Sequence, residues 1–221
     1  MLMKKQETQK QKDERIKRAR VVLRKLKKLF PEAGMMLRFT NNWELLVAVE
    51  LSAQCTDKKV DEITPALFKK YPTLLDYVHA IPSEFEQMIF QSGFYRNKTK
   101  NILAAAKMVH ETFHGELPRT MKEMLTIPGV ARKTANVVLG NAYGIVEGIA
   151  VDTHVKRLSH LLGLSDENNP NNIEKDLMEI FPKKEWFHVT YLLIEYGRKY
   201  CTARKHDHTV CPLGAYKEKH T

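Results

Sequence analysis

The sequence predicts an all-α protein. Apolar residues recur at three- and four-residue steps along most of the chain, which is the spacing of one helix face. No segment longer than the short apolar run 149–151 shows the pattern of a β-strand, and we expect that run to be a buried connector. Because 43% of the 221 residues are hydrophobic, the chain can build a substantial core.

The first expected helix covers residues 5–29 and is strongly basic. Its apolar residues nevertheless share one face that can pack on a core. These residues are Ile16, Ala19, Val22, Leu23, Leu26 and Phe30. The charged face suits contact with phosphates and a plain solvated surface equally well.

Further helices follow along the chain. Residues 43–53 are apolar at nearly every position, which predicts a helix that is buried on all sides. Pro65, Pro72 and Pro82 are expected at helix starts or breaks, and residues 98–113 form a longer amphipathic helix. The remaining helical stripes are Val60, Ile63 and Leu67; Phe85, Met88 and Ile89; Val155, Leu158 and Leu162; Ile173, Leu177 and Ile180; and residues 187–196.

The composition narrows the class of protein. Lys and Arg number 36 against 26 Asp and Glu, and a net charge of +10 favours a polyanionic partner, although it also favours solubility. The three cysteines leave one unpaired, which argues against a secreted disulfide scaffold and favours the reducing cytoplasm. The first thirty residues are too charged for a signal peptide, and no run of about 18 apolar residues predicts a membrane span.

The strongest local pattern is the segment 121–139, MKEMLTIPGVARKTANVVL. Two apolar helix faces flank a Pro-Gly turn at Ile127–Ala131. Proline and glycine break the helix, glycine tolerates the positive φ of a tight turn, and Ile127 and Val130 can seal the two helices together. The pattern predicts a helix-hairpin-helix.

The second helix of this hairpin would begin beside Arg132 and Lys133. The free backbone N–H groups of a helix start, next to two cations, make a site for a DNA phosphate. A Pro-Gly turn between two helices is also often only a connection, so the pattern alone leaves both interpretations open.

A second polar site follows in the segment 149–154, IAVDTH. The apolar connector leads directly to Asp152, whose carboxylate can cap the next helix. It can also handle protons and stabilise positive charge near Lys133, whose amine would attack carbon. The residue types allow both roles.

Three segments together resemble the endonuclease III family of DNA glycosylases: 51–57 (LSAQCTD), 127–138 and 151–154. The similarity runs from about residue 45 to residue 211. The superfamily is marked by a helix-hairpin-helix, a Gly/Pro-rich loop and an invariant aspartate, and the last of these corresponds to Asp152. The chain departs from the pattern in two places, since the last glycine of the hairpin is Ala131 and the loop before Asp152 has no proline.

The resemblance implies a bifunctional DNA glycosylase and AP lyase of base excision repair that excises oxidised pyrimidines. Lys133 matches the nucleophile of the family and Asp152 its essential carboxylate. The damaged nucleotide would be flipped out of the duplex, because its C1′ cannot be reached inside the stack. Lys133 would displace the base and form a Schiff base, and β-elimination of the 3′ phosphate would cut the strand.

The resemblance also implies the DNA contacts. Gln54 would fill the hole left by the flipped base, and Phe94 would wedge into the stack; without the family, a surface amide and a core phenylalanine are the simpler interpretations. The other expected DNA-binding residues are Ile127, Gly129, Ala131, Arg132 and His154. The expected partner of this monomer is double-stranded DNA with damaged bases or abasic sites, and the expected location is the cytoplasm, at the nucleoid.

The expected architecture has two helical lobes with DNA in the cleft between them. One lobe is a six-helix bundle over residues 35–145 that ends in the helix-hairpin-helix. The other is discontinuous and combines residues 1–34 with residues 146–221.

The C-terminal segment predicts no cofactor. Members of the family commonly carry four cysteines that bind a [4Fe–4S] cluster, and the corresponding positions here are Cys201, His208, Cys211 and Lys217. Lysine does not ordinarily ligate a cluster, and a cluster needs four soft ligands. Cys201, His206, His208 and Cys211 suit zinc by residue type, but histidines on a short loop are as easily solvated, so we expect no metal.

Two alternatives differ in chemistry. A monofunctional mismatch glycosylase would keep the fold, but such relatives usually lack a lysine at the position of Lys133. A non-catalytic helix-hairpin-helix protein would bind DNA and would have no need of Lys133 together with Asp152.

Overall fold

The computed structural model describes residues 8–216, and helices are the only regular secondary structure in that range. The predicted all-α class is therefore confirmed. None of the described helices combines the length and the apolar character that a membrane span needs.

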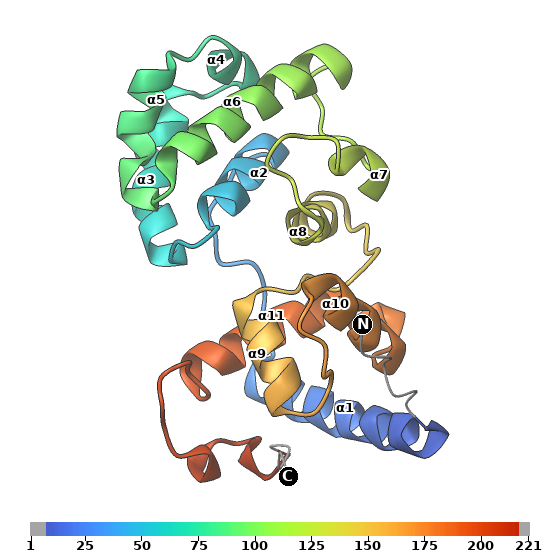
Figure 1. Cartoon of the computed structure of the whole chain (residues 1–221). Helices are drawn as coiled ribbons and strands as arrows, with labels where there is room; N and C mark the ends of the chain where they lie inside the picture. The colour runs from blue at the N-terminus through green and yellow to red at the C-terminus, as the bar shows by residue number, and fades with distance from the viewer. Residues whose placement is uncertain (1–7, 217–221) are drawn as a thin grey trace, which may run out of the picture. The chain divides into compact units, whose positions relative to one another are not determined.

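In chain order the α-helices are α1 (Gln9–Leu29), α2 (Asn42–Leu51), α3 (Asp57–Lys70), α4 (Leu74–Val78), α5 (Pro82–Ile89), α6 (Tyr95–Thr112), α7 (Met121–Met124), α8 (Arg132–Tyr143), α9 (Thr153–Leu161), α10 (Pro170–Ile180) and α11 (Trp186–Lys199) (Figure 1). Short 3-10 helices are η1 (Phe90–Ser92), η2 (Lys183–Glu185), η3 (His208–Val210) and η4 (Gly214–Tyr216).

The chain divides into two compact units. Met35–Glu147 forms one, which we call the hairpin unit because it contains α7 and α8. Met1–Gly34 and Gly148–Thr221 combine into the other, which we call the terminal unit. The chain thus begins in the terminal unit, passes through the hairpin unit and returns.

In the hairpin unit, α2 is surrounded by other helices. Each side chain from Glu44 to Leu51 is buried, which follows from the apolar run that predicted this helix. Helix α2 contacts α3, α6 and α8, and α6 contacts α4 and α5 (Figure 1). Asn41 caps α2, since its side-chain oxygen accepts a hydrogen bond from the Glu44 N–H at 2.9 Å. Because α2 is packed in this way, the loops at its two ends start from fixed positions.

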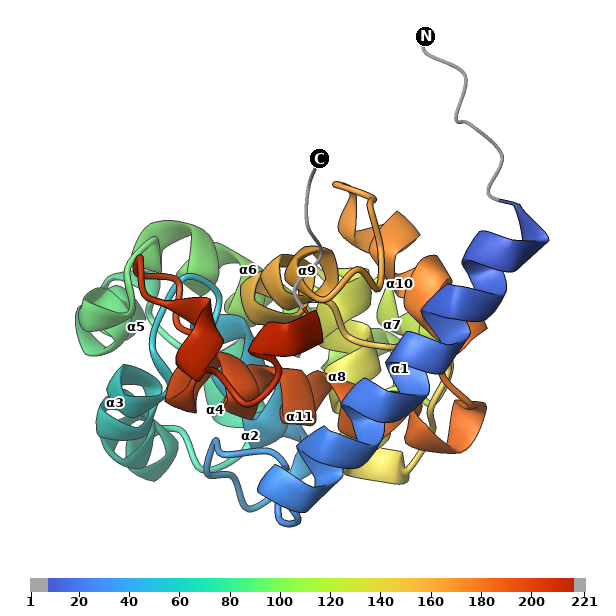
Figure 2. The ribbon, with the colours of Figure 1, turned by 90° about the horizontal axis from the view of Figure 1, so that it is seen from below.

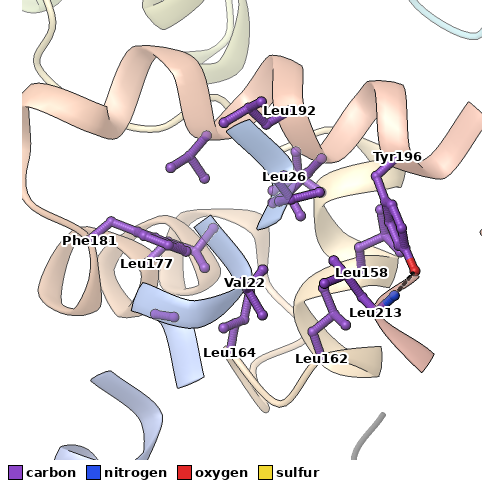
Figure 3. Close-up of a cluster of buried hydrophobic side chains, with 14 of the residues drawn as sticks. Val22, Leu26, Leu158, Leu162, Leu164, Leu177, Phe181, Leu192, Tyr196 and Leu213 are labelled. Atoms are coloured by element: carbon purple, nitrogen blue, oxygen red, sulfur yellow. Dashed lines mark hydrogen bonds between the residues drawn. The ribbon is translucent and has the colours of Figure 1, made fainter. Parts of the chain in front are cut away.

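The terminal unit is built on α1 and α11. Helix α1 contacts α10 and α11, and α9 packs against α11 and α10 (Figure 2). Side chains from all four helices meet in one core (Figure 3). The last described segment joins this core through Leu213, whose N–H donates a hydrogen bond to the Tyr196 hydroxyl at 3.1 Å.

Two local features differ from the sequence expectation. Pro65 lies inside α3 and not at its start or end. Proline cannot donate the helical hydrogen bond, but the burial of Ile63 and Leu67 on the same helix opposes that loss. The short helix α4 was not expected, because five residues are too few to show a periodic stripe; Thr73 and Asp76 stabilise it with a capping box.

Candidate functional site

The helix-hairpin-helix is formed by α7, a tight turn and α8. The Val130 N–H donates to the Ile127 carbonyl at 3.1 Å and closes the turn. Ile127 and Val130 are both buried, 2% and 7% exposed, so these two side chains anchor the turn in the hairpin unit. The start of α8 is thereby fixed relative to the core of this unit.

Gly129 at the centre of the turn meets two separate requirements. Its φ of +84° lies in the left-handed region that only glycine adopts without strain. A Cβ at this position would lie 2.7 Å from each carboxylate oxygen of Glu50 on α2. The turn therefore lies directly against the Glu50 carboxyl group, which would have to move to admit a side chain at position 129.

Glu50 is an unusual neighbour for a backbone turn. The residue is 7% exposed, and its Oε1 atom has no hydrogen-bond partner among the described residues. Burial raises the pKa of Glu50 to about 8, because the charged form would lose its hydration. The folded protein thus favours a neutral carboxyl group under the hairpin at neutral pH.

The start of α8 offers an anion site. Ala131 is the N-cap residue with φ −88° and ψ 169°, an extended conformation that any residue adopts, so the alanine in place of the usual glycine causes no strain. Within the described chain no side chain caps this helix start. The first N–H groups of a helix have no partner inside it, and they attract anions together with the helix dipole.

Arg132 and Lys133 are the first two residues of α8, and both side chains are half-buried. From Thr134 to Gly140 every residue of the helix is buried. The contrast places Lys133 at the boundary between the packed helix and its exposed start. A lysine amine in such a place is held by a rigid element and remains accessible to a ligand.

Asp152 belongs to the terminal unit, whereas Lys133 belongs to the hairpin unit. Residues 149–151 are buried and lead to Asp152, as the sequence suggested. One carboxylate oxygen, Oδ1, accepts a hydrogen bond from the Val155 N–H at 2.8 Å and caps α9. The capping role is thus real, and it uses only one of the two carboxylate oxygens.

His154 lies in the first turn of α9, where it faces α11. A Cβ at Gly197 of α11 would lie 2.6 Å from its Nδ1 atom. The close approach of α9 to α11 therefore depends on Gly197 and fixes the ring of His154. This contact is structural, and the expected DNA contact of His154 stays a prediction.

Gln54 and Phe94 lie in the hairpin unit on two strained loops. Both have positive φ, 53° and 47°, which is uncommon for residues with a side chain. Gln54 is exposed and Phe94 is 66% exposed. The interpretation of Phe94 as a core residue is therefore wrong, and both side chains project from the protein surface.

Lys98 connects the two segments that lead into these loops. Its Nζ atom donates to the Leu51 carbonyl and to the Ser92 carbonyl, each at 2.8 Å. The residue is 7% exposed, and burial lowers the pKa of its ammonium group. Leu51 ends α2 before the Gln54 loop, and Ser92 ends η1 before Gly93 and Phe94, so one buried cation fastens both segments.

Sequence reasoning missed Glu50 and Lys98, although each left a signal. Glu50 is a charged residue inside the apolar run 43–53. Lys98 precedes Ile102 by four residues and Ala105 by seven, so it falls on the apolar face of its helix. A charged side chain on a buried face needs a partner or a shifted pKa, so a charged residue at such a position indicates a specific contact in the core.

The C-terminal segment corrects the expectation of no cofactor. Cys201, His206, His208 and Cys211 each offer one ligand atom, and these four atoms lie within 4.8 Å of one another. The sequence argument compared positions at the cysteine spacing of the family, where Lys217, outside the described residues, ends the set. It also set aside Cys201, His206, His208 and Cys211 as solvated side chains, whereas the structure gathers their four ligand atoms into a group that could hold a metal ion. The expectation of no cofactor is therefore wrong.

Comparisons with known proteins show which family this chain resembles in sequence and in fold. The sequence model of the HhH-GPD superfamily of base excision DNA repair proteins matches residues 47–183. The endonuclease III of Synechocystis sp. is 50% identical over 188 residues, 85% of this chain and 86% of that protein. A solved non-covalent endonuclease III–DNA complex has a TM-score of 0.88 at 42% identity and covers 91% of this chain and 94% of that chain.

A second similar structure is a trapped endonuclease III–DNA covalent intermediate. Its TM-score is 0.86 at 43% identity, and the match covers 90% of this chain and 93% of that chain. The similarity thus extends over both units of the chain.

Replacing Glu50 with glutamine is expected to remove a pH dependence of stability. The pKa of Glu50 rises from 4.5 to about 8 on folding, so the folded state keeps its proton longer than the unfolded state. Below pH 4.5 the carboxyl group is protonated in both states. As the pH rises from 4.5 to about 8, the unfolded state ionises first, so the free energy of unfolding falls until the folded state ionises as well. Thermal unfolding from about pH 5 to about pH 9 should show the Tm of the wild type falling relative to that of Glu50→Gln. The exposed Glu116→Gln is the control, and parallel curves for all three proteins would contradict the assignment.

Replacing Lys98 with methionine is expected to destabilise the protein by about 2 kcal/mol or more, because two buried carbonyls lose a charged donor. Methionine keeps much of the side-chain volume, so the loss reports the hydrogen bonds. Lys100→Met changes an exposed lysine of the same helix and is the matched control. Urea unfolding gives both free energies, and equal stability of the two variants would refute the role of Lys98.

Proposed function

Because the chain belongs to the endonuclease III family of the HhH-GPD superfamily, we propose that Lys133 is the nucleophile and Asp152 the essential carboxylate of its reaction. Membership of this family makes the chain a bifunctional DNA glycosylase and AP lyase of base excision repair, and double-stranded DNA its partner. The observation that carries the proposal is the place of Lys133 on the first turn of α8, directly after the hairpin.

The chemistry requires an amine that can reach a sugar carbon. The lone pair of Lys133 Nζ forms a bond to C1′ of the flipped nucleotide, and the base leaves with the electron pair of the glycosidic bond. Opening of the sugar ring gives a Schiff base. Loss of a C2′ proton then expels the 3′ phosphate and cuts the strand. The similarity to a protein that was trapped as a covalent DNA intermediate supports this route.

Asp152 stabilises the positive charge that develops at the sugar and the amine, and it handles protons. Its capping bond to α9 supports this role, because the bond holds the carboxylate in one orientation. The second carboxylate oxygen serves the reaction.

The hairpin holds the DNA backbone. Gly129 and Ala131 contribute N–H groups to a phosphate, and Arg132 supplies positive charge at the same helix start. The buried side chain of Ile127 anchors the turn in the core of the hairpin unit. Such contacts carry no sequence information, which suits an enzyme that must act on lesions anywhere in a genome.

Gln54 and Phe94 act on the base stack. Phe94 enters the stack as an apolar wedge, and Gln54 occupies the space of the flipped base. Their exposure, and the strained backbone that presents them, support these roles. His154 contributes a DNA contact from the terminal unit.

The substrates are oxidised pyrimidines, excised from chromosomal DNA by a monomer in the cytoplasm at the nucleoid. A monofunctional mismatch glycosylase is the second candidate, and the lysine at position 133 disfavours it. A non-catalytic DNA-binding protein is the third candidate; it would explain the hairpin but gives no role to Lys133 and Asp152 together.

Lys133→Gln is expected to abolish borohydride trapping on a duplex with an abasic site. The wild type should form a stable covalent complex, because borohydride reduces the Schiff base to an amine. Lys122→Gln, an exposed lysine on α7, is the control and should trap like the wild type. If Lys133→Gln still traps, another amine is the nucleophile. If the wild type binds the duplex without trapping or nicking, a binding protein or a monofunctional enzyme replaces the present proposal.

Asp152→Asn is expected to separate catalysis from folding. The asparagine oxygen can still cap α9, so the Tm should stay close to that of the wild type. Single-turnover excision of an oxidised pyrimidine should slow by about 100-fold or more, since charge stabilisation and proton transfer are lost. An undiminished rate in the folded variant would assign Asp152 the capping role alone.

A further inference from the structure

The ligand cluster, which we define as Cys201, His206, His208 and Cys211, lies after the end of α11 and around η3 in the terminal unit. Cys201 and Cys211 are 0% and 7% exposed, whereas the two histidines are half-buried. The two cysteines are thus buried, and the two histidines remain partly accessible to solvent.

The distances within the ligand cluster suit one metal ion. Cys201 Sγ lies 3.6 Å from His208 Nδ1, and Cys211 Sγ lies 3.4 Å from His206 Nε2. Zn–S bonds of about 2.3 Å and Zn–N bonds of about 2.0–2.1 Å in a tetrahedron place sulfur and nitrogen about 3.6 Å apart. Both separations are close to this tetrahedral edge.

The same distances do not suit a [4Fe–4S] cluster. Such a cluster binds each protein ligand to a different iron atom, so its ligands stand farther apart than those of one ion, and it asks for four thiolates. The described chain offers two thiolates and two imidazoles here, all within 4.8 Å of one another. The donor set and its compactness therefore point to a single ion.

The hydrogen bond of His206 prepares the correct ring nitrogen for a metal. His206 Nδ1 lies 2.7 Å from the Arg204 carbonyl oxygen, which can only accept a hydrogen bond. Nδ1 must therefore carry the hydrogen, and the lone pair of the neutral ring is on Nε2, the atom that faces Cys211 Sγ. A carbonyl that fixes the tautomer in this way is the usual outer partner of a metal-binding histidine.

Arg157 supports the other side of the ligand cluster. Its Nη2 donates to the Cys201 carbonyl at 2.7 Å, and its Nη1 lies 3.7 Å from Cys201 Sγ. The Nη1 contact places a positive charge beside this sulfur atom. The contact also fixes the backbone of Cys201 against α9.

The segment between the two cysteines has little else to hold it. Residues 202–210 contain no buried side chain, so packing contributes little to their order. Their regular structure is the short η3, at His208–Val210. A bound ion would close this loop by joining both of its ends and two points inside it.

We propose that the ligand cluster binds one Zn²⁺ ion in place of a [4Fe–4S] cluster, as a structural Cys₂His₂ site that closes the loop 201–211 onto the terminal unit. Zn²⁺ takes two thiolates and two neutral imidazoles in tetrahedral geometry, and the two thiolates neutralise its charge. All four positions are filled by protein, so the ion has no open position for catalysis.

The first test is the metal content of the full chain purified under reducing conditions. Elemental analysis should find about one zinc per chain, and acid-labile sulfide should be absent. Replacement of zinc by Co²⁺ should give the intense visible bands of a tetrahedral site and a near-ultraviolet thiolate-to-cobalt band. About four irons with sulfide, or a folded and fully reduced chain that takes up neither zinc nor cobalt, would overturn the proposal.

Two pairs of variants locate the ion. Cys211→Ser and His206→Gln should each weaken zinc binding by more than about tenfold, since even the loss of an outer-shell partner commonly costs that much. Cys55→Ser and His188→Gln alter residues outside the ligand cluster and should bind zinc like the wild type. Undiminished binding in both ligand variants would place the ion elsewhere and overturn the proposal.

Metal removal tests the structural role in the unaltered protein. A chelator should lower the Tm of the wild type, and added Zn²⁺ but not Mg²⁺ should restore it. A Tm that does not change when the zinc is removed would refute the structural role.

Discussion

The close contact between the Gly129 turn and Glu50 governs the geometry of the hairpin unit. Helix α2 is buried on all sides, and its residue Glu50 lies against the turn. The turn has glycine at this point, so no Cβ collides with the Glu50 carboxyl group. This contact sets where α8 begins, and the start of α8 carries Lys133. A neutral carboxyl is the form that suits such a site, because a buried carboxylate without a partner is costly. The position of Lys133, the proposed nucleophile, thus depends on a glycine and on a buried acid.

A second set of constraints acts on the loops that present Gln54 and Phe94. Lys98 satisfies two carbonyls below these loops, and both loop residues adopt positive φ. Backbone strain of this kind persists only where the surrounding contacts determine the conformation. The buried ammonium supplies those contacts. The hairpin unit thus holds the start of α8, with Lys133, and the exposed side chains of Gln54 and Phe94 on rigid supports, and preorganisation of this kind is what the proposed roles of these residues require.

The sequence was sufficient for the all-α class, the hairpin and the family, because each depends on local periodicity or on a compact motif such as residues 127–138. It was not sufficient for Glu50 and Lys98, whose roles arise from contacts between distant segments. The expectation of no metal failed for a related reason. The residue types of Cys201, His206, His208 and Cys211 were visible in the sequence, but histidines on a short loop are as easily solvated, and only the fold of the 201–211 loop brings His206 to Cys211. Residue types show which ligands are available, whereas the distances between them depend on the backbone path.

Mass spectrometry of the borohydride-trapped complex after nuclease and trypsin digestion tests most directly whether the Lys133 amine forms the covalent bond to DNA. A reduced adduct on Lys133 blocks cleavage there, while cleavage after Arg132 remains possible, so the account predicts a nucleotide remnant on the peptide 133–156. Fragmentation should assign the added mass to Lys133. An adduct on a different lysine or on the N-terminal amine would contradict the account.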